Sequence, residues 1–444
     1  MDSTTNIAPS MPAILVQRDA DRFFHQVGSS PCIGALRAVS GIWLEDDSGR
    51  RLIDLHGNTT HHIGHANPQL VAALKLQLDS LTFSPRRYTN EPAVQLAEHL
   101  TDLWPGPAAR VLFTTGGSDA IEVALKLARV ATGRSATLSL EGSYHGHGFG
   151  AFGLSHAHHD PRLGSFLPDR VLVTPYWDKA GGGADAMLAQ IEQALATTPG
   201  GIAALIAEPI RSNCHVPPDH LWREVRRLCD AAGTLLIFDE IPSGLGKTGR
   251  FFAFEHFGVV PDAVVLGKSL GGGMLPIAAV IADARLNVAP ELALGHYTHE
   301  KNPLTTRAAA TTVEIIVRDN LAQRAARLED HVRQRVALAS ASCPAIKGIR
   351  GRGLLLAIEL DLAVLGGARP ALGDAIIAAC LEHGVSTTTK GEDALGFSPP
   401  LTITEDEIDL AIDSIAAALR CLACQPGLNA PALPVFTRQT DEPD

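Results

Sequence analysis

Three short apolar segments limit the folds open to this chain more than any other feature: Ile202–Ile206, Leu235–Phe238 and Ala263–Gly267. A strand with one face in water alternates apolar and polar residues, so runs this uniformly apolar are typical of strands buried on both faces. A helical pattern over Leu221–Ala232 separates the first two runs. This alternation predicts an α/β fold with a mainly parallel sheet that helices cover on both sides.

Other segments extend the pattern toward both ends of the chain. Further strands are expected within Ile42–Leu55 (two, around a DDSGR turn), and at Arg110–Thr114, Ala136–Leu140, Ile277–Ala282 and Gly353–Leu360. Further helices are expected at Pro68–Leu81, Glu91–Leu103, Ser118–Thr132, Thr305–Val317, Asn320–Ala341, Ala371–His383 and Glu405–Leu422. The last of these suggest a smaller α+β domain after the large one.

Composition narrows the class of partner. The 444 residues carry a net charge of −11 without a basic patch, which argues against nucleic acid or an anionic membrane as a partner. No apolar run reaches the roughly 18 residues of a membrane span, and no signal peptide is read at the N-terminus. The 7 cysteines are scattered, as in reduced proteins, so we expect a soluble cytoplasmic protein.

Candidate ligand residues stand where predicted strands end, the edge at which open α/β sheets bind ligands. In TTGGSDA, Gly117 and Ser118 come between a strand and a helix, so free N–H groups can bind phosphate; a plain structural turn is the alternative. Asp239 ends a buried strand, where a carboxylate needs a partner: a protonated pyridine nitrogen, a magnesium ion or an ordinary cap. Lys268 follows another strand, where partial burial would make its amine nucleophilic; a solvated lysine is the alternative.

The stretch EGSYHGHGFG adds an aromatic ring and two histidines. Tyr144 offers a face on which a planar ring can stack. His145 and His147 have the spacing of metal ligands, and four further histidines lie upstream. Without an HExxH motif or a carboxylate triad, however, we predict no metal site.

In this order and at this spacing, these segments resemble the class-III aminotransferases, a family of pyridoxal phosphate (PLP) enzymes with fold type I. The resemblance covers residues 35–420 and is carried by FTTGGSDAIEVALKLARVATGR (113–134), SYHGHGFG (143–150), AEPI (207–210), FDEIPSGLGKTGRF (238–251), LGKSLGGGMLPIAAVI (266–281), THEKNPLTTRAAA (298–310) and PPLTITEDEID (399–409). It implies a seven-stranded, mainly parallel sheet domain flanked by helices, and a smaller α+β domain built from the N- and C-terminal segments.

The implied domains have the following bounds. Residues 1–60 would join the small domain, with a loosely structured lead-in over 1–30. Residues 61–315 would form the large PLP-binding domain and residues 316–425 the C-terminal part of the small domain. The Pro-rich residues 426–444 are expected to be a flexible tail.

The resemblance also implies roles around the cofactor ring. Lys268 matches the catalytic lysine that holds PLP as a Schiff base. Asp239 matches the partner of the pyridine nitrogen, Ile241 the aliphatic residue under the ring, and Tyr144 the aromatic residue on its other face.

The same resemblance assigns the phosphate end. Gly117 and Ser118 match the phosphate cradle, and Glu208 matches an acidic residue near the ring. Thr298 matches a threonine that reaches the phosphate of the neighbouring subunit, which implies a homodimer with shared active sites.

Two departures from the family pattern bear on the reaction. Most of its aminotransferases read DEVQ where this chain reads DEIP, and Pro242 cannot make the glutamine's contact with the cofactor's phenolic oxygen. Members that bind 2-oxoglutarate often carry an arginine two residues before Pro-Pro-Leu. Here that position is Phe397, preceded by Gly396, so the usual carboxylate clamp is missing.

Other residues border the region that faces the substrate in the family. Arg86 and Arg87 of SPRRYTN offer planar donors to a carboxylate, phosphate or phosphonate, although a solvent-facing pair is an equal alternative. Asn58 borders the substrate in the family, with a plain turn asparagine as the alternative.

The stretches DEIPSGLGKTG and HYTHEKNPL resemble the branch that includes (R)-1-hydroxy-2-aminoethylphosphonate ammonia-lyase. The branch implies elimination of ammonia from a small primary amine bearing a phosphonate, a step of phosphonate catabolism. A lyase needs no keto-acid substrate, which fits the missing clamp and glutamine. Transamination from a primary amine or amino acid to a keto acid such as pyruvate is the alternative, because pyruvate depends little on an arginine that clamps its carboxylate.

Overall fold

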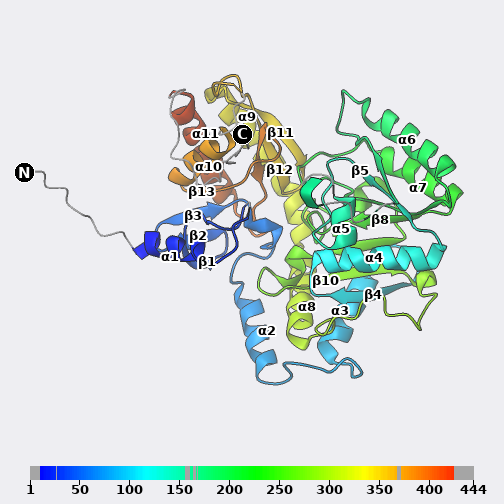
Figure 1. Ribbon diagram of the computed structural model, residues 1–444. Helices are drawn as coiled ribbons and strands as arrows, with labels where there is room; N and C mark the ends of the chain where they lie inside the picture. Colours follow the sequence, from blue (N-terminus) through cyan, green and yellow to red (C-terminus); the bar gives the residue numbers. More distant parts are fainter. Residues whose placement is uncertain are drawn as a thin grey trace, which may run out of the picture.

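The computed structural model describes residues 11–26, 28–155, 161–163, 167, 169–367 and 372–424. The expected tail over residues 426–444 lies outside them. A large domain carries the central sheet, and a smaller domain, which contains both the first strands and the last helices, packs beside it (Figure 1).

The central sheet has seven strands in the order β4 (Ala109–Thr114), β10 (Ala278–Asp283), β9 (Ala263–Leu266), β8 (Leu235–Asp239), β7 (Ile202–Ala207), β5 (Ala136–Leu140) and β6 (Arg170–Val173). All pairs from β9 to β6 are parallel, whereas β10 pairs antiparallel with both of its neighbours. The prediction of a mainly parallel seven-stranded sheet is therefore confirmed.

Successive side chains of these strands enter two separate cores. In β8, Leu236 and Phe238 belong to one apolar cluster, and Leu235 and Ile237 belong to the other. Because side chains alternate between the faces of a strand, both faces of the sheet are covered, and that is why the strands contain no regular polar positions.

Helices connect and cover the strands: α2 (Pro68–Leu78), α3 (Glu91–Asp102), α4 (Gly117–Thr132), α5 (Phe149–Leu154), α6 (Gly183–Thr197), α7 (Leu221–Ala232) and α8 (Pro303–Arg318). Helix α4 begins directly after β4 and ends at Gly133, whose left-handed conformation lets its N–H bond to the carbonyl of Arg129. No helix in the described part of the chain is long and apolar enough to cross a membrane.

Two small sheets form the second domain. One has the order β1 (Leu36–Ser40), β2 (Trp43–Asp46), β3 (Arg51–Asp54) and β13 (Val385–Ser386); the other has the order β11 (Ile346–Arg352), β12 (Leu355–Leu360) and β14 (Ala394–Phe397). The helices α9 (Leu321–Ser342), α10 (Leu372–Glu382) and α11 (Glu405–Ala423) complete the domain. The parallel pair β3–β13 joins the N-terminal and C-terminal segments in one sheet.

The expected loose lead-in is wrong in part, because helix α1 spans Met11–Ala20. Its apolar residues Ile14 and Leu15 are exposed, and none of the side chains described in this helix is buried, so no apolar stripe marks it as a helix. Strands β1, β6, β11, β13 and β14 and helices α5 and α6 were also not expected.

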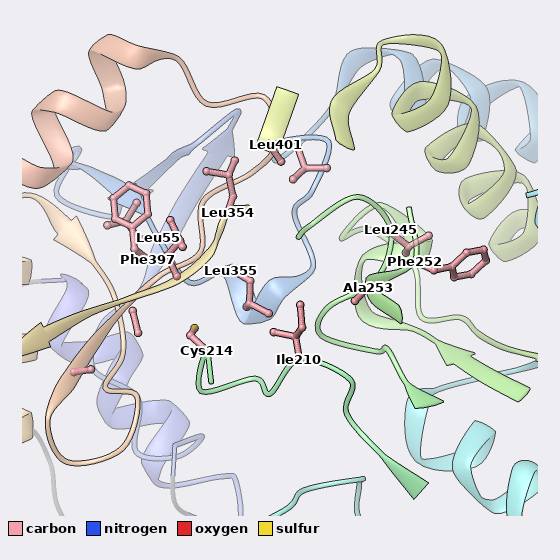
Figure 2. Close-up of a cluster of buried hydrophobic side chains, with 14 of the residues drawn as sticks. Leu55, Ile210, Cys214, Leu245, Phe252, Ala253, Leu354, Leu355, Phe397 and Leu401 are labelled. Carbon is pink, nitrogen blue, oxygen red and sulfur yellow. The ribbon is translucent and has the colours of Figure 1, made fainter. Parts of the chain in front are cut away.

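The two domains share a continuous apolar core. Figure 2 shows Leu55 and Phe397 of the small domain on one side of this core and Ile210 and Leu245, which follow strands β7 and β8, on the other side. Leu354, Leu355 and Leu401 lie between them, and all belong to one buried cluster. The loops after these strands, which carry the candidate site, are therefore supported by the small domain.

Phe397 should contribute strongly to this shared core, because its side chain is fully buried. Replacing Phe397 by alanine should lower the free energy of unfolding by about 3–5 kcal/mol. Urea denaturation followed by tryptophan fluorescence measures the change. Phe24→Ala is the matched control, because the Phe24 side chain is 97% exposed; equal losses in the two variants would contradict the packing described above.

Candidate active site

Residues at the ends of β4, β7, β8 and β9 meet around one cavity of about 220 Å³. It is lined by Gly117, Ser118, Tyr144, His145, Gly146, Glu208, Ser212, Asp239, Ile241, Pro242 and Lys268. Larger cavities of about 520 to 580 Å³ occur elsewhere, but their linings do not include Lys268 or Asp239. The cavity is below the usual 300–1,000 Å³ of drug-sized ligands, so it suits a single small ring.

One wall of the cavity is the N-terminus of helix α4. Gly116, the residue that precedes the helix, makes no side-chain cap, so the first N–H groups of α4 have no partner within the helix. Ser118 adds a hydroxyl, whose oxygen accepts the N–H of His147 at 3.0 Å. Free N–H groups and the positive end of the helix dipole together favour an anion such as phosphate.

Glycines allow the chain to approach itself closely around this wall. A Cβ atom on Gly117 would lie 2.7 Å from Cδ1 of Ile241, and one on Gly146 would lie 2.5 Å from Oγ of Ser118. Gly146 also has a φ of +121°, which a residue with a side chain rarely adopts. The glycines therefore hold Ile241 and Ser118 at the rim of the cavity.

Asp239 is buried at the end of β8 and faces the cavity. One carboxylate oxygen accepts the N–H of Ile241 at 3.1 Å, and the other lies 2.8 Å from Nδ1 of His145. A proton on Nδ1 makes His145 a donor to Asp239, and this bond orients the carboxylate while leaving it negative. His145 was expected only as a weak metal candidate, since its partner lies 94 residues away in the sequence.

The neighbouring acid, Glu240, points away into the protein. Its two carboxylate oxygens accept the N–H groups of Ala253 and Phe254, each at 2.7 Å. Burial raises the pKa of Glu240 to about 8. Of the adjacent pair in FDEIP, only Asp239 therefore presents a charge to the cavity.

Lys268 follows β9 and enters the same cavity. Its backbone has a φ of +45°, a conformation that non-glycine residues seldom adopt and that costs energy, and such strain is typical of functional sites. The surrounding protein lowers the pKa of Lys268 by desolvation, while the negative charges of Asp239 and Glu208 partly oppose this shift. The lysine therefore has a larger neutral, nucleophilic fraction than an exposed one.

Tyr144 and Glu208 complete the lining. Burial and the charge of Asp239 raise the pKa of Tyr144, so its phenol stays neutral. Glu208 is buried and forms an ion pair with Arg211, whose guanidinium also donates to the carbonyl of Gly142. The second oxygen of Glu208 accepts the N–H of Ser212 at 3.1 Å. Arg211 and Ser212, which the sequence did not suggest, thus fix this acid in place.

This set of groups fits pyridoxal phosphate. The cofactor has a phosphate, an aldehyde and a ring nitrogen that can be protonated. The cavity offers uncapped helix N–H groups, a lysine amine with a lowered pKa and a buried carboxylate whose hydrogen-bond partners among the described residues are a histidine and one N–H. Because one small cavity holds all three groups, the residues present can hold the cofactor.

Four predicted site residues do not line this cavity. Arg86 forms an ion pair with Glu300 at 3.3 Å, and Arg87 is exposed. Asn58 is exposed with a φ of +48°, as in a turn, and Thr298 is exposed. Within one chain the structure therefore brings seven of the predicted residues together and leaves these four outside.

A second cluster of polar side chains lies near the upstream histidines. Asp54, His61 and His65 have atoms of the kind that bind metals within 4.8 Å of one another. Asp54 already accepts the N–H groups of His56 and Gly57, at 3.0 and 2.8 Å, and bonds to His65 at 2.8 Å. These hydrogen bonds stabilise the turn after β3 and explain why the three side chains lie together.

Comparisons with known proteins agree with this geometry. The family model described as Aminotransferase class-III matches residues 25–419. (R)-1-hydroxy-2-aminoethylphosphonate ammonia-lyase of Vibrio splendidus is 34% identical over 428 residues, which is 91% of this chain and 89% of that protein. Acetylornithine aminotransferase of Methanosarcina mazei is 30% identical over 416 residues, covering 91% and 96%. An amine transaminase of an uncultivated Pseudomonas species in its PLP-bound form has a TM-score of 0.82 at 28% identity, covering 90% and 99%.

The close approach of Gly146 to Ser118 gives a test of the cavity. In Gly146→Ala the new Cβ would displace the serine hydroxyl and strain the backbone, so the affinity of the apoprotein for PLP should fall about tenfold or more. This affinity is measured by titrating the apoprotein with PLP and monitoring the quenching of tryptophan fluorescence. Gly34→Ala, where no atom lies within 4 Å of the new Cβ, should bind PLP as the wild type does. An unchanged affinity in Gly146→Ala would mean that PLP binds elsewhere.

Proposed function

The chain belongs to the class-III aminotransferase family, and from this premise we propose that it is a PLP-dependent ammonia-lyase acting on (R)-1-hydroxy-2-aminoethylphosphonate. The products would be ammonia and phosphonoacetaldehyde. The name of the Vibrio splendidus relative and the residues at the substrate side of the cavity support this choice over the other reactions of the family.

The observation that carries the proposal is the orientation of β14. The Phe397 side chain packs in the shared core, and Gly396, on the opposite face of the strand, has no side chain. Neither position supplies the arginine with which relatives of this kind bind a keto acid. Pro242, which lines the cavity, has no side-chain donor. A lyase requires neither group, since it has only one substrate.

Residues of the cavity would hold the cofactor and act in this reaction. The first N–H groups of α4 and the Ser118 hydroxyl would hold its phosphate, and Ile241 and Tyr144, which both line the cavity, would contact its ring. Asp239, which is bonded to His145, would stabilise a proton on the ring nitrogen. Pyridoxal phosphate, when bound, supplies the electron sink for the carbon that carries the amine.

Lys268 performs the proton transfer. The amine of Lys268 would take a proton from the aminomethyl carbon of the substrate, and its lowered pKa favours the neutral form that this step needs. The C–O bond of the neighbouring carbon would then break, and the hydroxyl would leave as water with the proton that Lys268 took up. The released enamine takes up one water and gives ammonia and phosphonoacetaldehyde, so the net reaction consumes no water.

Transamination is the second candidate, favoured by the aminotransferases among the relatives. The same Lys268 would then move the proton from the donor's carbon to the cofactor, and a keto acid would take up the amino group. Pyruvate is the best acceptor for this chain, because a small keto acid depends less on an arginine clamp.

We further propose a homodimer in which Thr298 completes the neighbouring site. The segment around Thr298 lies beside the loop between α2 and α3: Asn90 donates to the carbonyl of Lys301 at 2.9 Å, and Arg86 pairs with Glu300. Neither segment lines its own chain's cavity. An interface there would bring Thr298 and the two arginines to the partner's cofactor.

The reaction is tested by incubating the holoenzyme with (R)-1-hydroxy-2-aminoethylphosphonate in the absence of any keto acid. Ammonia and phosphonoacetaldehyde should accumulate in equal amounts over many turnovers. Lys268→Ala should lose about 10³-fold or more in rate together with the visible absorption band of the bound cofactor. Lys126→Ala, a change at an exposed lysine of α4, should keep both. Turnover that starts only after pyruvate or 2-oxoglutarate is added, with alanine or glutamate as product, would replace the lyase by the aminotransferase.

Shared sites predict that two inactive variants restore activity when mixed. Thr298→Glu places a negative charge beside the partner's phosphate, and Lys268→Ala removes the catalytic lysine of its own chain. A mixed dimer has one intact site, so refolding equal amounts together should recover about a quarter of the wild-type activity.

The control mixture combines Lys268→Ala with Asp239→Ala. Both changes damage the site of their own chain, so their mixed dimers have no intact site and should stay inactive. If the Thr298→Glu mixture also stays inactive, Thr298 does not serve the neighbouring site.

A further inference from the structure

The space beside Gly396 is filled by Lys390, which lies in the segment between β13 and β14. The chain between β13 and β14 folds back on β14, with the N–H of Gly396 bonded to the carbonyl of Thr388 and the N–H of Lys390 bonded to the carbonyl of Ala394. A Cβ atom on Gly396 would lie 3.2 Å from Cε of Lys390 and 3.4 Å from Cγ2 of Thr388. The stem of Lys390 thus occupies the volume into which a side chain at position 396 would extend.

The Lys390 ammonium lies near the substrate side of the cavity. Its positive charge is one of the causes that lower the pKa of Lys268, after burial, and it is the second cause, after burial, that lowers the pKa of His56. The backbone places it there too: the N–H of Leu55 bonds to the carbonyl of Ser386 and the N–H of Ser398 bonds to the carbonyl of Leu55, so the segment that carries Lys390 lies beside the turn that follows β3. Lys390 does not line the part of the cavity that would take the cofactor.

No negative charge neutralises this lysine within the described residues. The nearby acids are engaged elsewhere: Asp239 with His145, Glu208 with Arg211, and Asp393 with Arg350 at 3.7 Å. Among the residues that the structure describes, Lys390 forms no ion pair. Because the pKa of His56 is lowered, His56 is neutral at pH 7 and adds a hydrogen-bonding group without a second charge.

We propose that Lys390 binds the acidic end of the substrate, in the space where relatives place an arginine, and that it makes the site selective for a phosphonate over a carboxylate. This inference rests on the proposed function and names the residue that recognises its substrate. An arginine fork matches a planar carboxylate through two parallel hydrogen bonds. A lysine ammonium is a compact point charge without a planar geometry, so it suits a tetrahedral, doubly charged group such as a phosphonate.

The test compares binding and turnover in three variants: Lys390→Gln, Lys390→Arg and, as a control at an exposed site, Lys126→Gln. Ethylphosphonate, which has the acidic group but no amine, is titrated calorimetrically into each holoenzyme. Lys390→Gln should weaken its binding about tenfold to a hundredfold, whereas Lys126→Gln should leave it unchanged. Lys390→Arg keeps the charge and should retain most of the binding, which guards against a loss caused by misfolding.

Turnover supplies the second readout. For (R)-1-hydroxy-2-aminoethylphosphonate, Lys390→Gln should raise KM by a similar factor. For 1-amino-2-propanol, in which a methyl group replaces the phosphonate, kcat/KM should be the same in Lys390→Gln and in the wild type. The affinity for propionate, the matched carboxylate without an amine, should already be lower than that for ethylphosphonate in the wild type.

The outcomes separate this inference from the proposed function. If the wild type turns over the hydroxylated aminophosphonate but Lys390→Gln binds ethylphosphonate as tightly, the role of Lys390 is refuted and the lyase stands. If the wild type shows no such turnover, the lyase fails, and calorimetry still decides whether Lys390 binds the anion. A wild type that does not bind ethylphosphonate at all overturns the inference.

Discussion

The architecture of the site depends on one buried carboxylate. Asp239 ends a strand that is buried on both faces, and a charge in that position is tolerated only if other groups stabilise it. His145 and the N–H of Ile241 supply part of that stabilisation, and a protonated ring nitrogen would supply the rest. Strand β9 runs parallel to β8, and β4 runs in the same direction because β10 pairs antiparallel with both β4 and β9; Lys268 and the N-terminus of α4 therefore come to the same edge of the sheet as Asp239. The sheet thus fixes the spacing between the three parts of a small cofactor.

Rigidity is supplied from both domains. Glycines let the β4–α4 turn and the segment around Gly146 pack against Ser118 and Ile241 without space for a Cβ atom. The loops after β7 and β8 lie against the small domain through Ile210 and Leu245 (Figure 2). Lys268 holds a strained backbone between β9 and β10, and such strain persists only where the surrounding packing determines the conformation. A site built in this way is formed before any ligand arrives.

The sequence predicted the fold class and the family, and both are confirmed by the sheet topology and by the family match. These predictions were possible because apolar strands and glycine-rich turns are local patterns that can be recognised within a few consecutive residues. The assembly of Gly117, Tyr144, Asp239 and Lys268 in one cavity agrees with the residues expected there, although their roles remain predictions. Residues whose meaning depends on distant partners were not predictable. His145 meets Asp239, 94 residues away, only through tertiary pairing, and Lys390 meets Gly396 only because the chain between β13 and β14 folds back on β14. None of the side chains described in helix α1 is buried, so no apolar stripe revealed it.

The packing of β14 also constrains how this site can change during evolution. Phe397 is held in the core, so an arginine there would bury a charge among apolar side chains. An arginine at position 396 would meet the stem of Lys390. A change from a lysine-based to an arginine-based site therefore requires two coupled substitutions, the gain of arginine at position 396 and the loss of Lys390. The first alone overfills the pocket, and the second alone leaves it without a cation. Such epistasis would keep neighbouring branches of the family apart, because each intermediate sequence loses the old substrate before it gains the new one.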